Sequence, residues 1–225
     1  MQIAVRRDML GTSLGLFCFG YVWYFLLTWL PSYLVMERHF SLRAMALFGA
    51  LPFCGSALSA LFSGWASDRL IARGASVTRV RKSFVVAGML LCTLILPGAM
   101  VRDPVLAMTL LTMACLAIGL FSSNVWAITQ TLAGPTAAGK WSGMQNAVGN
   151  MGGVVSPLVT GLVVSRTHSF FLAFAAATLA LLIGAGAYLF LLGEIAPLSW
   201  KAGVESAATS GGVTRRVATQ SGVWR

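Results

Sequence analysis

Charge is scarce in this sequence, and acidic charge is the scarcest. Only 10% of the 225 residues are Asp, Glu, Lys or Arg, against roughly 25% in an average soluble domain. Six residues are acidic and sixteen are basic, while 57% are apolar. So few charges do not cover the surface of a soluble fold of this size. The composition therefore excludes a soluble globular enzyme and a disordered chain.

Cysteine, histidine and enzyme motifs are also in short supply. The four cysteines stand singly in four different apolar runs, which excludes a disulfide scaffold and predicts buried structural thiols. The two histidines, His39 and His168, fall at the edges of apolar runs. No zinc-protease, nucleophile-elbow or phosphate-loop motif is present, so we expect no enzyme activity, no metal and no cofactor.

Long stretches without any charged residue define the architecture. A helix needs ~20 apolar residues to cross ~30 Å of hydrocarbon, and charges retreat to its ends because a central charge is costly. The sequence therefore predicts an all-α membrane protein with six transmembrane helices. The six charge-free stretches are 9–36, 44–67, 83–101, 104–139, 141–165 and 167–193.

Basic residues are unevenly distributed between the loops. With six crossings both termini lie on one side, and that side carries twelve Lys and Arg residues against four on the other. The positive-inside rule then predicts cytoplasmic termini and an inner, plasma-membrane location. The +10 net charge is explained by these loops, so we expect no nucleic-acid partner. Residues 1–9 form a cytoplasmic segment without a cleavable signal, and residues 199–225 are predicted to be a disordered cytoplasmic tail.

The first three helices resemble the last three. At an offset of 103, Val22 and Trp23 fall on Val125 and Trp126. At an offset of 97, helix two matches helix five at five positions. Three helices per repeat place the two copies in opposite membrane orientations, which is typical of transporters and sets the binding site at the repeat interface. The five matched pairs are Gly55/Gly152, Ser59/Ser156, Leu61/Leu158, Gly64/Gly161 and Arg69/Arg166.

A short motif, GWASDRLIARG at 64–74, ends the second helix. Asp68 is the only acid in a loop with five basic residues. A carboxylate at this edge can meet a helix dipole or an arginine and favour one conformer, or it can simply be solvated. We assign a conformational role to the loop motif residues Gly64, Asp68, Arg69 and Arg73.

The first half of this motif resembles the loop signature of the major facilitator superfamily, and its second half departs from it. The departure is similar to the anion:cation symporter subgroup, which transports sugar acids and other organic anions. Three further strings resemble the same subgroup: YFLLTWLPSYLV at 24–35, GMQNAVGNMGGVVSPLVTG at 143–161 and FLLGEIAPL at 190–198.

The resemblance implies one half of a twelve-helix fold, namely helices seven to twelve, over residues 10–198. On that basis the chain is a truncated product or one part of a split protein, and the N-terminal six-helix half is missing. The intact protein would move small organic anions by alternating access. Proton symport would be driven from the missing half, because no ionisable residue lies at mid-membrane here.

Neutral polar and aromatic residues remain as the candidate substrate-binding residues. Amides are costly in hydrocarbon, so they face either a cavity or another helix. Trp126 and Asn146 match positions that contact a sugar acid in the resembled subgroup. We expect Tyr24, Ser123, Trp126 and Asn146 to form this half's share of the site. Hydroxyls and amides suit a polyol chain, and an indole suits its carbon skeleton.

Two other functions remain open at this point. The chain could be a non-functional fragment that inserts but carries nothing, or two copies could assemble into a pore or transporter. The expected partners are therefore a small organic anion, the lipid bilayer, protons acting through the missing half, and either that half or a second copy.

Overall fold

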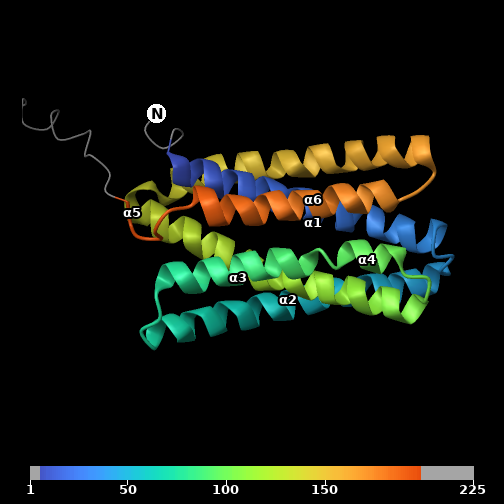
Figure 1. Cartoon of the computed structure of the whole chain (residues 1–225), viewed down its shortest axis with the longest axis horizontal. Helices are drawn as coiled ribbons and strands as arrows, with labels where there is room; N and C mark the ends of the chain where they lie inside the picture. Colours follow the sequence, from blue (N-terminus) through green and yellow to red (C-terminus); the bar gives the residue numbers. More distant parts are fainter. Residues whose placement is uncertain (1–5, 199–225) are drawn as a thin grey trace, which may run out of the picture.

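The computed structural model describes residues 6–198 and contains only helices and their connections there. This confirms the predicted all-α membrane fold (Figure 1). The predicted tail at 199–225 lies outside the described residues, as do residues 1–5. In chain order the helices are α1 (Arg7–Met36), α2 (Leu42–Ala72), α3 (Val77–Cys92), α4 (Ile95–Met100), α5 (Pro104–Thr167), α6 (Phe171–Gly186) and the π-helical turn η1 (Ala187–Leu191).

Residues 6–198 form six membrane crossings, although only five helices within that range are long and apolar enough to span a bilayer. The reason is α5, whose 64 residues form two arms. Gly134 interrupts the helix with a φ of 62°, a left-handed conformation that glycine adopts without a Cβ clash. We call 104–133 the first arm and 135–167 the second arm. The chain therefore folds back at Gly134 (Figure 1), and the five helices contain the six crossings that the sequence predicts.

Two helix boundaries differ from the prediction. The turn between the fourth and fifth crossings is at Gly134, six residues before the charge at Lys140, because glycine and not charge allows the sharp reversal. The third crossing begins at Val77 rather than at residue 83, so that Arg79, Arg81 and Lys82 lie in its first two turns. The same crossing is broken between α3 and α4, just before Pro97.

Side-chain caps explain where two other helices begin. The Ser41 hydroxyl accepts a hydrogen bond from the Ala44 amide at 3.2 Å and starts α2. Asp103 accepts one from the Leu106 amide at 2.7 Å and starts α5, with Pro104 at the first helical position. Both caps satisfy amides that have no partner within the helix.

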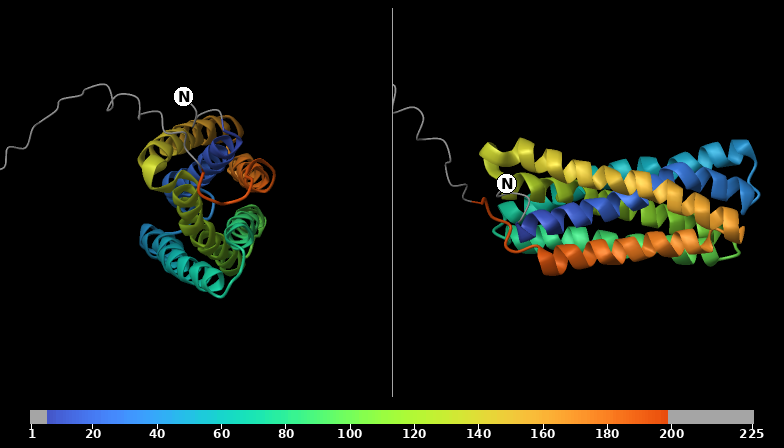
Figure 2. Two further views of the ribbon diagram at one scale, coloured as in Figure 1. Left: turned by 90° about the vertical axis from the view of Figure 1, so that its left-hand side faces the viewer. Right: turned by 90° about the horizontal axis from the view of Figure 1, so that it is seen from above.

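The six crossings pack around α1 and α5. Seen end-on, α3 and α6 lie on one side of the bundle, and α2 and the second arm of α5 reach toward the other side (Figure 2). The core between them is mostly apolar, and its largest side chains, among them Phe25, Phe121, Phe174 and Trp141, are fully buried. Phe25 and Phe174 meet edge to face with ring centroids 4.9 Å apart.

The inverted repeat is visible in two equivalent helix pairs. On one, the Asn124 amide of α5 donates to the Ser63 hydroxyl of α2 at 2.8 Å. The same offsets of 103 and 97 map Asn124 to Tyr21 and Ser63 to Thr160. Tyr21 of α1 indeed lies against Thr160 of the second arm. The two three-helix units therefore cross the membrane in opposite directions and use corresponding contacts.

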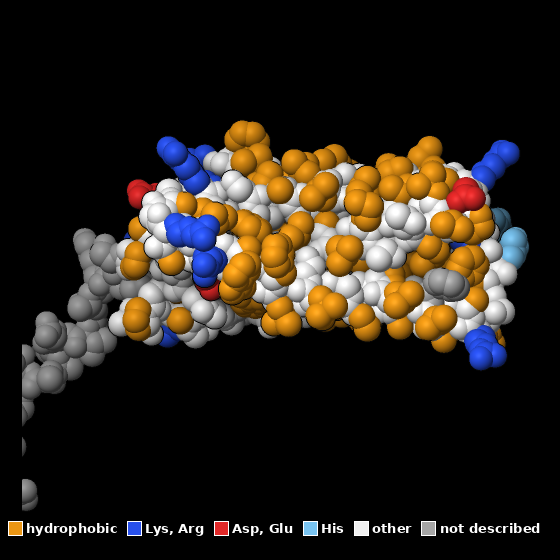
Figure 3. All heavy atoms as spheres, turned by 90° about the horizontal axis from the view of Figure 1, so that it is seen from below, with side chains coloured by type: hydrophobic (Ala, Val, Ile, Leu, Met, Phe, Trp, Pro, Cys, Tyr) orange, Lys and Arg blue, Asp and Glu red, His pale blue; other side chains and the backbone are white. Residues whose placement is uncertain are grey.

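Charged side chains gather at the two ends of the bundle, and hydrophobic side chains cover the middle (Figure 3). The first and last described residues lie at the same end of the bundle, which we call the terminal end (Figure 1). We call the opposite end of the bundle the far end. This distribution is what a bilayer requires, and the chain is an integral membrane protein.

A clamp at the far end joins α1 to α4 and α6. The Glu37 carboxylate accepts from the Phe170 amide at 3.2 Å, at the start of α6. Arg38 donates to the carbonyls of Gly98 and Ala99 at 3.0 Å and of Val101 at 2.6 Å, at the end of α4. An acid thus meets a helix N-terminus and a base meets a C-terminus, the arrangement that both helix dipoles favour.

Candidate functional site

The four candidate substrate residues lie on three crossings. Tyr24 on α1 and Ser123 and Trp126 on the first arm of α5 are half-buried, whereas Asn146 on the second arm is exposed. In the described part of the chain no hydrogen bond joins any two of these four side chains. Each of them nevertheless has at least part of its surface free for contact with a ligand.

A polar chain links Tyr24 to the second arm. The Tyr24 hydroxyl donates to the Asn150 side-chain oxygen at 3.2 Å, and the Asn150 amide donates to the Asn146 carbonyl at 2.9 Å. Gly153 lies beneath the Tyr24 ring, where any Cβ would collide with it. The ring is therefore held in place, and the Asn146 side chain remains free to bind.

Ser123 faces α2 and takes part in helix packing. Its hydroxyl donates to the Ser63 hydroxyl at 3.3 Å, and Ser63 in turn donates to the Leu120 carbonyl at 2.6 Å. Trp126 packs partly against the hydrophobic core. The structure thus gives Ser123 a protein partner and leaves the indole of Trp126 with an accessible part.

Other polar residues of the same two arms are buried away from the surface. Asn124, Thr129 and Gln145 have no exposed surface. The Thr129 hydroxyl donates to the Gln145 side-chain oxygen at 2.7 Å, while the Gln145 amide nitrogen has no partner. The polar residues of the fourth and fifth crossings therefore divide into an exposed group and an interhelical group, and only the first can meet a ligand directly.

The loop motif residue Asp68 is paired, but with a residue outside the motif. Arg81 of α3 forms an ion pair with Asp68 at 2.6 Å. It also donates to Ser67 at 2.7 Å and to the Asn124 side-chain oxygen at 2.9 Å. The Asn124 amide in turn donates to the Ser63 hydroxyl of α2. We call these residues the Arg81 network, and they join α2, α3 and the first arm of α5 at the terminal end.

The remaining motif residues do not touch Asp68 through a hydrogen bond or ion pair in the described residues. The Arg69 guanidinium lies 5.7 Å from the centre of the Trp65 ring, a cation–π distance. Arg73 ends α2, and its amide donates to the Arg69 carbonyl at 3.2 Å. Gly64 lies close to Ser123 and brings α2 near the first arm. The motif residues thus pack around the end of α2, and the ion-pair partner of Asp68 is on α3.

Sequence reasoning missed Arg81 as the partner of Asp68 and Asn124 as a second partner of Arg81. One signal was available, because Asn124 aligns with Tyr21 and Ser63 with Thr160 in the repeat. That alignment points to an interhelical pair and not to a cavity-facing amide. No comparable pattern identifies Arg81, which is one of five basic residues near that loop.

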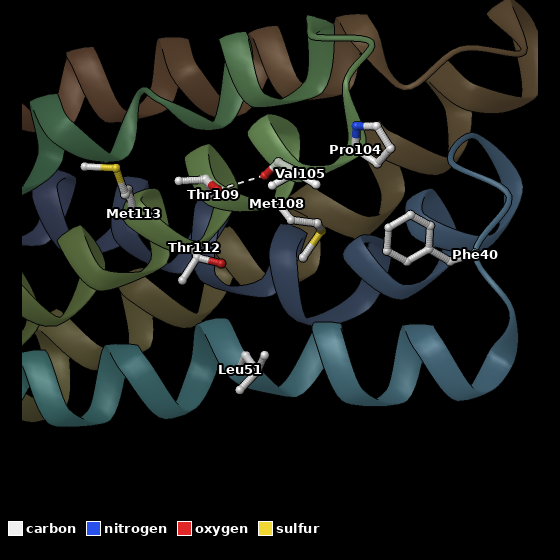
Figure 4. A pocket seen from close by; sticks show the side chains of 8 residues that line it. All are labelled: Phe40, Leu51, Pro104, Val105, Met108, Thr109, Thr112 and Met113. Atoms are coloured by element: carbon white, nitrogen blue, oxygen red, sulfur yellow. Dashed lines mark hydrogen bonds between the residues drawn. The ribbon is translucent and has the colours of Figure 1, made fainter.

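An apolar cavity of about 550 Å³ lies between α2 and the first arm, toward the far end (Figure 4). The Thr109 hydroxyl donates to the Val105 carbonyl at 2.8 Å and is thereby satisfied within its own helix. With no charged residue in its walls, this cavity is unsuited to a carboxylate. Its lining residues are Phe40, Leu51, Pro104, Val105, Met108, Thr109, Thr112 and Met113.

The chain matches one family and a group of named transporters. The sequence profile of the Major Facilitator Superfamily matches residues 12–222. The D-galactonate transporter of Escherichia coli O6:H1 (strain CFT073) is 30% identical over 194 residues, which are 86% of this chain and 45% of that protein. The probable galactarate/D-glucarate transporter GarP of Escherichia coli K12 is 34% identical, over 86% of this chain and 44% of that protein.

A third relative carries a different acid in its name. The probable sulfoacetate transporter SauU of Cupriavidus necator is 34% identical over 83% of this chain and 43% of its own length. Among solved structures, the peptide transporter POT with alafosfalin has a TM-score of 0.68 at 18% identity, over 86% of this chain and 42% of that one. This chain therefore spans less than half the length of the relatives that it matches. All three named relatives are transporters, which agrees with the prediction that the chain is not an enzyme.

Proposed function

Because the chain belongs to the Major Facilitator Superfamily, we propose that it is the C-terminal, six-helix half of a secondary active transporter for small organic anions. Sugar acids are the favoured substrates. The observation that carries this proposal is the set of names among the relatives, which cover galactonate, galactarate, glucarate and sulfoacetate at 30–34% identity. All four compounds are small organic acids.

In this proposal Tyr24, Ser123, Trp126 and Asn146 contribute one wall of the substrate site. The free amide of Asn146 donates to and accepts from the hydroxyls of a polyol, and the Trp126 indole covers its carbon skeleton. Tyr24 is held by Asn150 and orients that wall. Ser123 joins when its hydroxyl exchanges Ser63 for the substrate.

We assign binding of the substrate carboxylate and coupling to protons to the complementary half. Every Asp, Glu, Lys and Arg of the described chain lies within about two turns of the end of a helix or of an arm of α5, or in a connection. On the face drawn in Figure 3 the charged side chains gather at the two ends of the bundle. A titratable group in the pathway and a cation for the substrate are what proton-coupled anion transport requires. We therefore assign both to the other six helices, with transport by rocking of the two halves.

The Arg81 network serves as the conformational element of this half. It joins α2, which carries Asp68, to α3 and to the first arm of α5. Its central side chain, Arg81, is mostly buried, with 13% of its surface exposed. Rocking that moves α2 against α3 would have to break these hydrogen bonds. In this proposal Asp68 acts through Arg81, whereas Gly64, Arg69 and Arg73 hold the end of α2 in place, so that the motif stabilises one conformer over the other.

Orientation and domain limits complete the proposal. The excess of basic residues at the terminal end supports cytoplasmic termini in an inner membrane. Residues 1–9 then form a cytoplasmic segment, residues 10–198 the membrane half and residues 199–225 a cytoplasmic tail.

The test is uptake of labelled D-galactonate by cells that lack sugar-acid transporters. Three strains express this chain alone, the part of the Escherichia coli D-galactonate transporter that it does not match, or both. We expect uptake only with both. Uptake by this chain alone that scales with the square of its amount would instead indicate a two-copy assembly. No uptake in any strain would favour an inert fragment and reject the proposal.

A further inference from the structure

Helix α1 and the second arm of α5 cross at a point where glycines on both helices let their backbones touch. A Cβ on Gly152 would lie 2.7 Å from the Tyr21 amide nitrogen, and a Cβ on Gly149 would lie 2.7 Å from the Leu16 side chain. Gly20 meets the Gly149 backbone in the same crossing. From this point the two helices diverge toward the terminal end (Figure 2). A wedge-shaped space opens between them, because two straight rods that cross at a close contact must separate on either side of it.

This space is a surface groove of about 670 Å³, which we call the wedge groove. Its walls are Leu10, Leu14 and Phe17 of α1 and Met144, Ala147 and Val148 of the second arm. Met144 and Val148 are four residues apart and share one side of the second arm. Asn146 and Asn150 share a different side, since they stand two positions away along the helix. The wedge groove therefore opens on a side of the bundle other than the proposed substrate wall.

One polar group lies in this otherwise apolar groove. The hydroxyl of Ser13 lines it, Ser13 is only 7% exposed, and the hydroxyl has no hydrogen-bond partner. A buried hydroxyl without a partner is unfavourable, particularly where no water is present to bind it. An acceptor supplied by a bound molecule would satisfy it.

Two cations lie at the rim of the groove, Lys140 and Arg7. The Arg7 guanidinium donates one hydrogen bond to the Phe190 carbonyl at 3.0 Å and keeps other N–H groups for an anion. Arg7 precedes Leu10 by three residues on α1, and Lys140 precedes Met144 by four on the second arm, so each cation lies one turn toward the terminal end from a groove residue. Both side chains are exposed. The nearby acid Asp8 is turned to the Gly193 amide, to which it is bonded at 2.9 Å. The rim therefore favours an anion.

We propose that the wedge groove binds one phospholipid with an anionic headgroup, taken from the leaflet at the terminal end. The acyl chain lies along Leu14, Phe17 and Val148. An ester carbonyl accepts the hydrogen bond from Ser13, and the headgroup phosphate meets Arg7 and Lys140. The bound lipid fills the wedge and so holds α1 and the second arm at a fixed angle. The leaflet is the inner one under the orientation proposed above, but the site does not depend on the transported substrate.

Native mass spectrometry of the purified 225-residue chain in a mild detergent tests this site, with phosphatidylglycerol and phosphatidylcholine as probes. We expect one retained phosphatidylglycerol per chain. Lys140→Gln should weaken phosphatidylglycerol about fivefold, the effect of one surface charge near an anionic lipid, and leave phosphatidylcholine unchanged. Arg79→Gln, an exposed cation of α3 at the same end, is the matched control and should change neither.

A second variant tests the groove itself. Ala147→Phe fills it and should remove the retained lipid of either kind, whereas Ala57→Phe, an exposed position of α2, should not. Equal lipid retention in Ala147→Phe and wild type would overturn the proposal, as would equal loss in both phenylalanine variants. Retention of inorganic phosphate as strong as that of phosphatidylglycerol would also overturn it, because the acyl chain would then contribute nothing. If the 225-residue chain retains the lipid but gives no sugar-acid uptake together with the complementary half, only the proposed function is contradicted.

Discussion

Substituting Gly152 by alanine should separate α1 from the second arm of α5 and destabilise the bundle. The new Cβ would lie 2.7 Å from the Tyr21 amide nitrogen and closer still to the Phe17 carbonyl oxygen, both of them backbone atoms. The carbonyl oxygen would be 2.4 Å from the new Cβ, and ordinary van der Waals contact begins at 3.4 Å, so the helices must move apart by about 1 Å. Overpacking of this kind costs about 1–3 kcal/mol.

The gain in helix propensity offsets part of that cost. Replacing a helical glycine by alanine contributes about 1 kcal/mol. We therefore expect Gly152→Ala to lose up to about 2 kcal/mol relative to wild type, which lowers the melting temperature by up to several degrees. In a membrane the loss falls on packing alone, because no hydrophobic effect draws the helices together.

The four free cysteines provide the assay. Cys18, Cys92 and Cys115 are buried and Cys54 is exposed, so a thiol-reactive fluorophore reports unfolding as the temperature rises. Gly143→Ala is the matched control on the same arm, because its Cβ would meet nothing within 4 Å. The control should melt at or above the wild-type temperature. If Gly152→Ala melts no lower than Gly143→Ala, the close crossing does not exist and the reasoning fails.

Three further predictions concern individual hydrogen bonds. Arg81→Met leaves the buried Asn124 oxygen without a donor and should lower the free energy of unfolding by about 2 kcal/mol, whereas Asp68→Asn, at an exposed partner, should change it by less than about 1 kcal/mol in the same melting assay. Arg38→Lys should lose about 1–2 kcal/mol, because an ammonium group cannot reproduce the fork that binds several carbonyls; a melting temperature equal to wild type would contradict this. Asn146→Ala should raise the KM for D-galactonate about five- to tenfold in the complemented transporter without changing the melting temperature, and an unchanged KM would remove Asn146 from the site.

The number of crossings could be predicted because one energetic term dominates it. A charge inside hydrocarbon is costly enough that charge-free stretches and spans nearly coincide. Boundaries follow weaker terms. Lys140 reaches water from within a helix, so its charge did not mark the turn, and the conformational freedom of Gly134 did.

The placement of the polar residues could be predicted less well. In a soluble helix the apolar side faces the core, but a membrane helix is apolar toward both core and lipid. Asn124 and Asn146 therefore look alike in the sequence, although one is fully buried and bonded to Arg81 and the other is exposed. Only the internal repeat distinguishes them, since it pairs Asn124 with the buried Tyr21.

The ion-pair partner of Asp68 could not be predicted from the sequence either. Arg69 and Arg73 are its neighbours in sequence, yet Arg81, thirteen residues away, forms the ion pair. The turn between α2 and α3 decides this, because it folds the start of α3 back against the end of α2. Sequence proximity in a basic loop does not identify a charge partner.

The central claim is that this six-helix half shapes the passage of a substrate but does not power it. The most direct test is reconstitution of the 225-residue chain alone in liposomes with an imposed pH gradient, acidic outside, and measurement of labelled D-galactonate inside. We expect no accumulation above the external concentration, because no Asp, Glu, Lys, Arg or His of the described residues lies in the middle of a crossing. Accumulation of the acid against its gradient, abolished by a protonophore, would contradict the account.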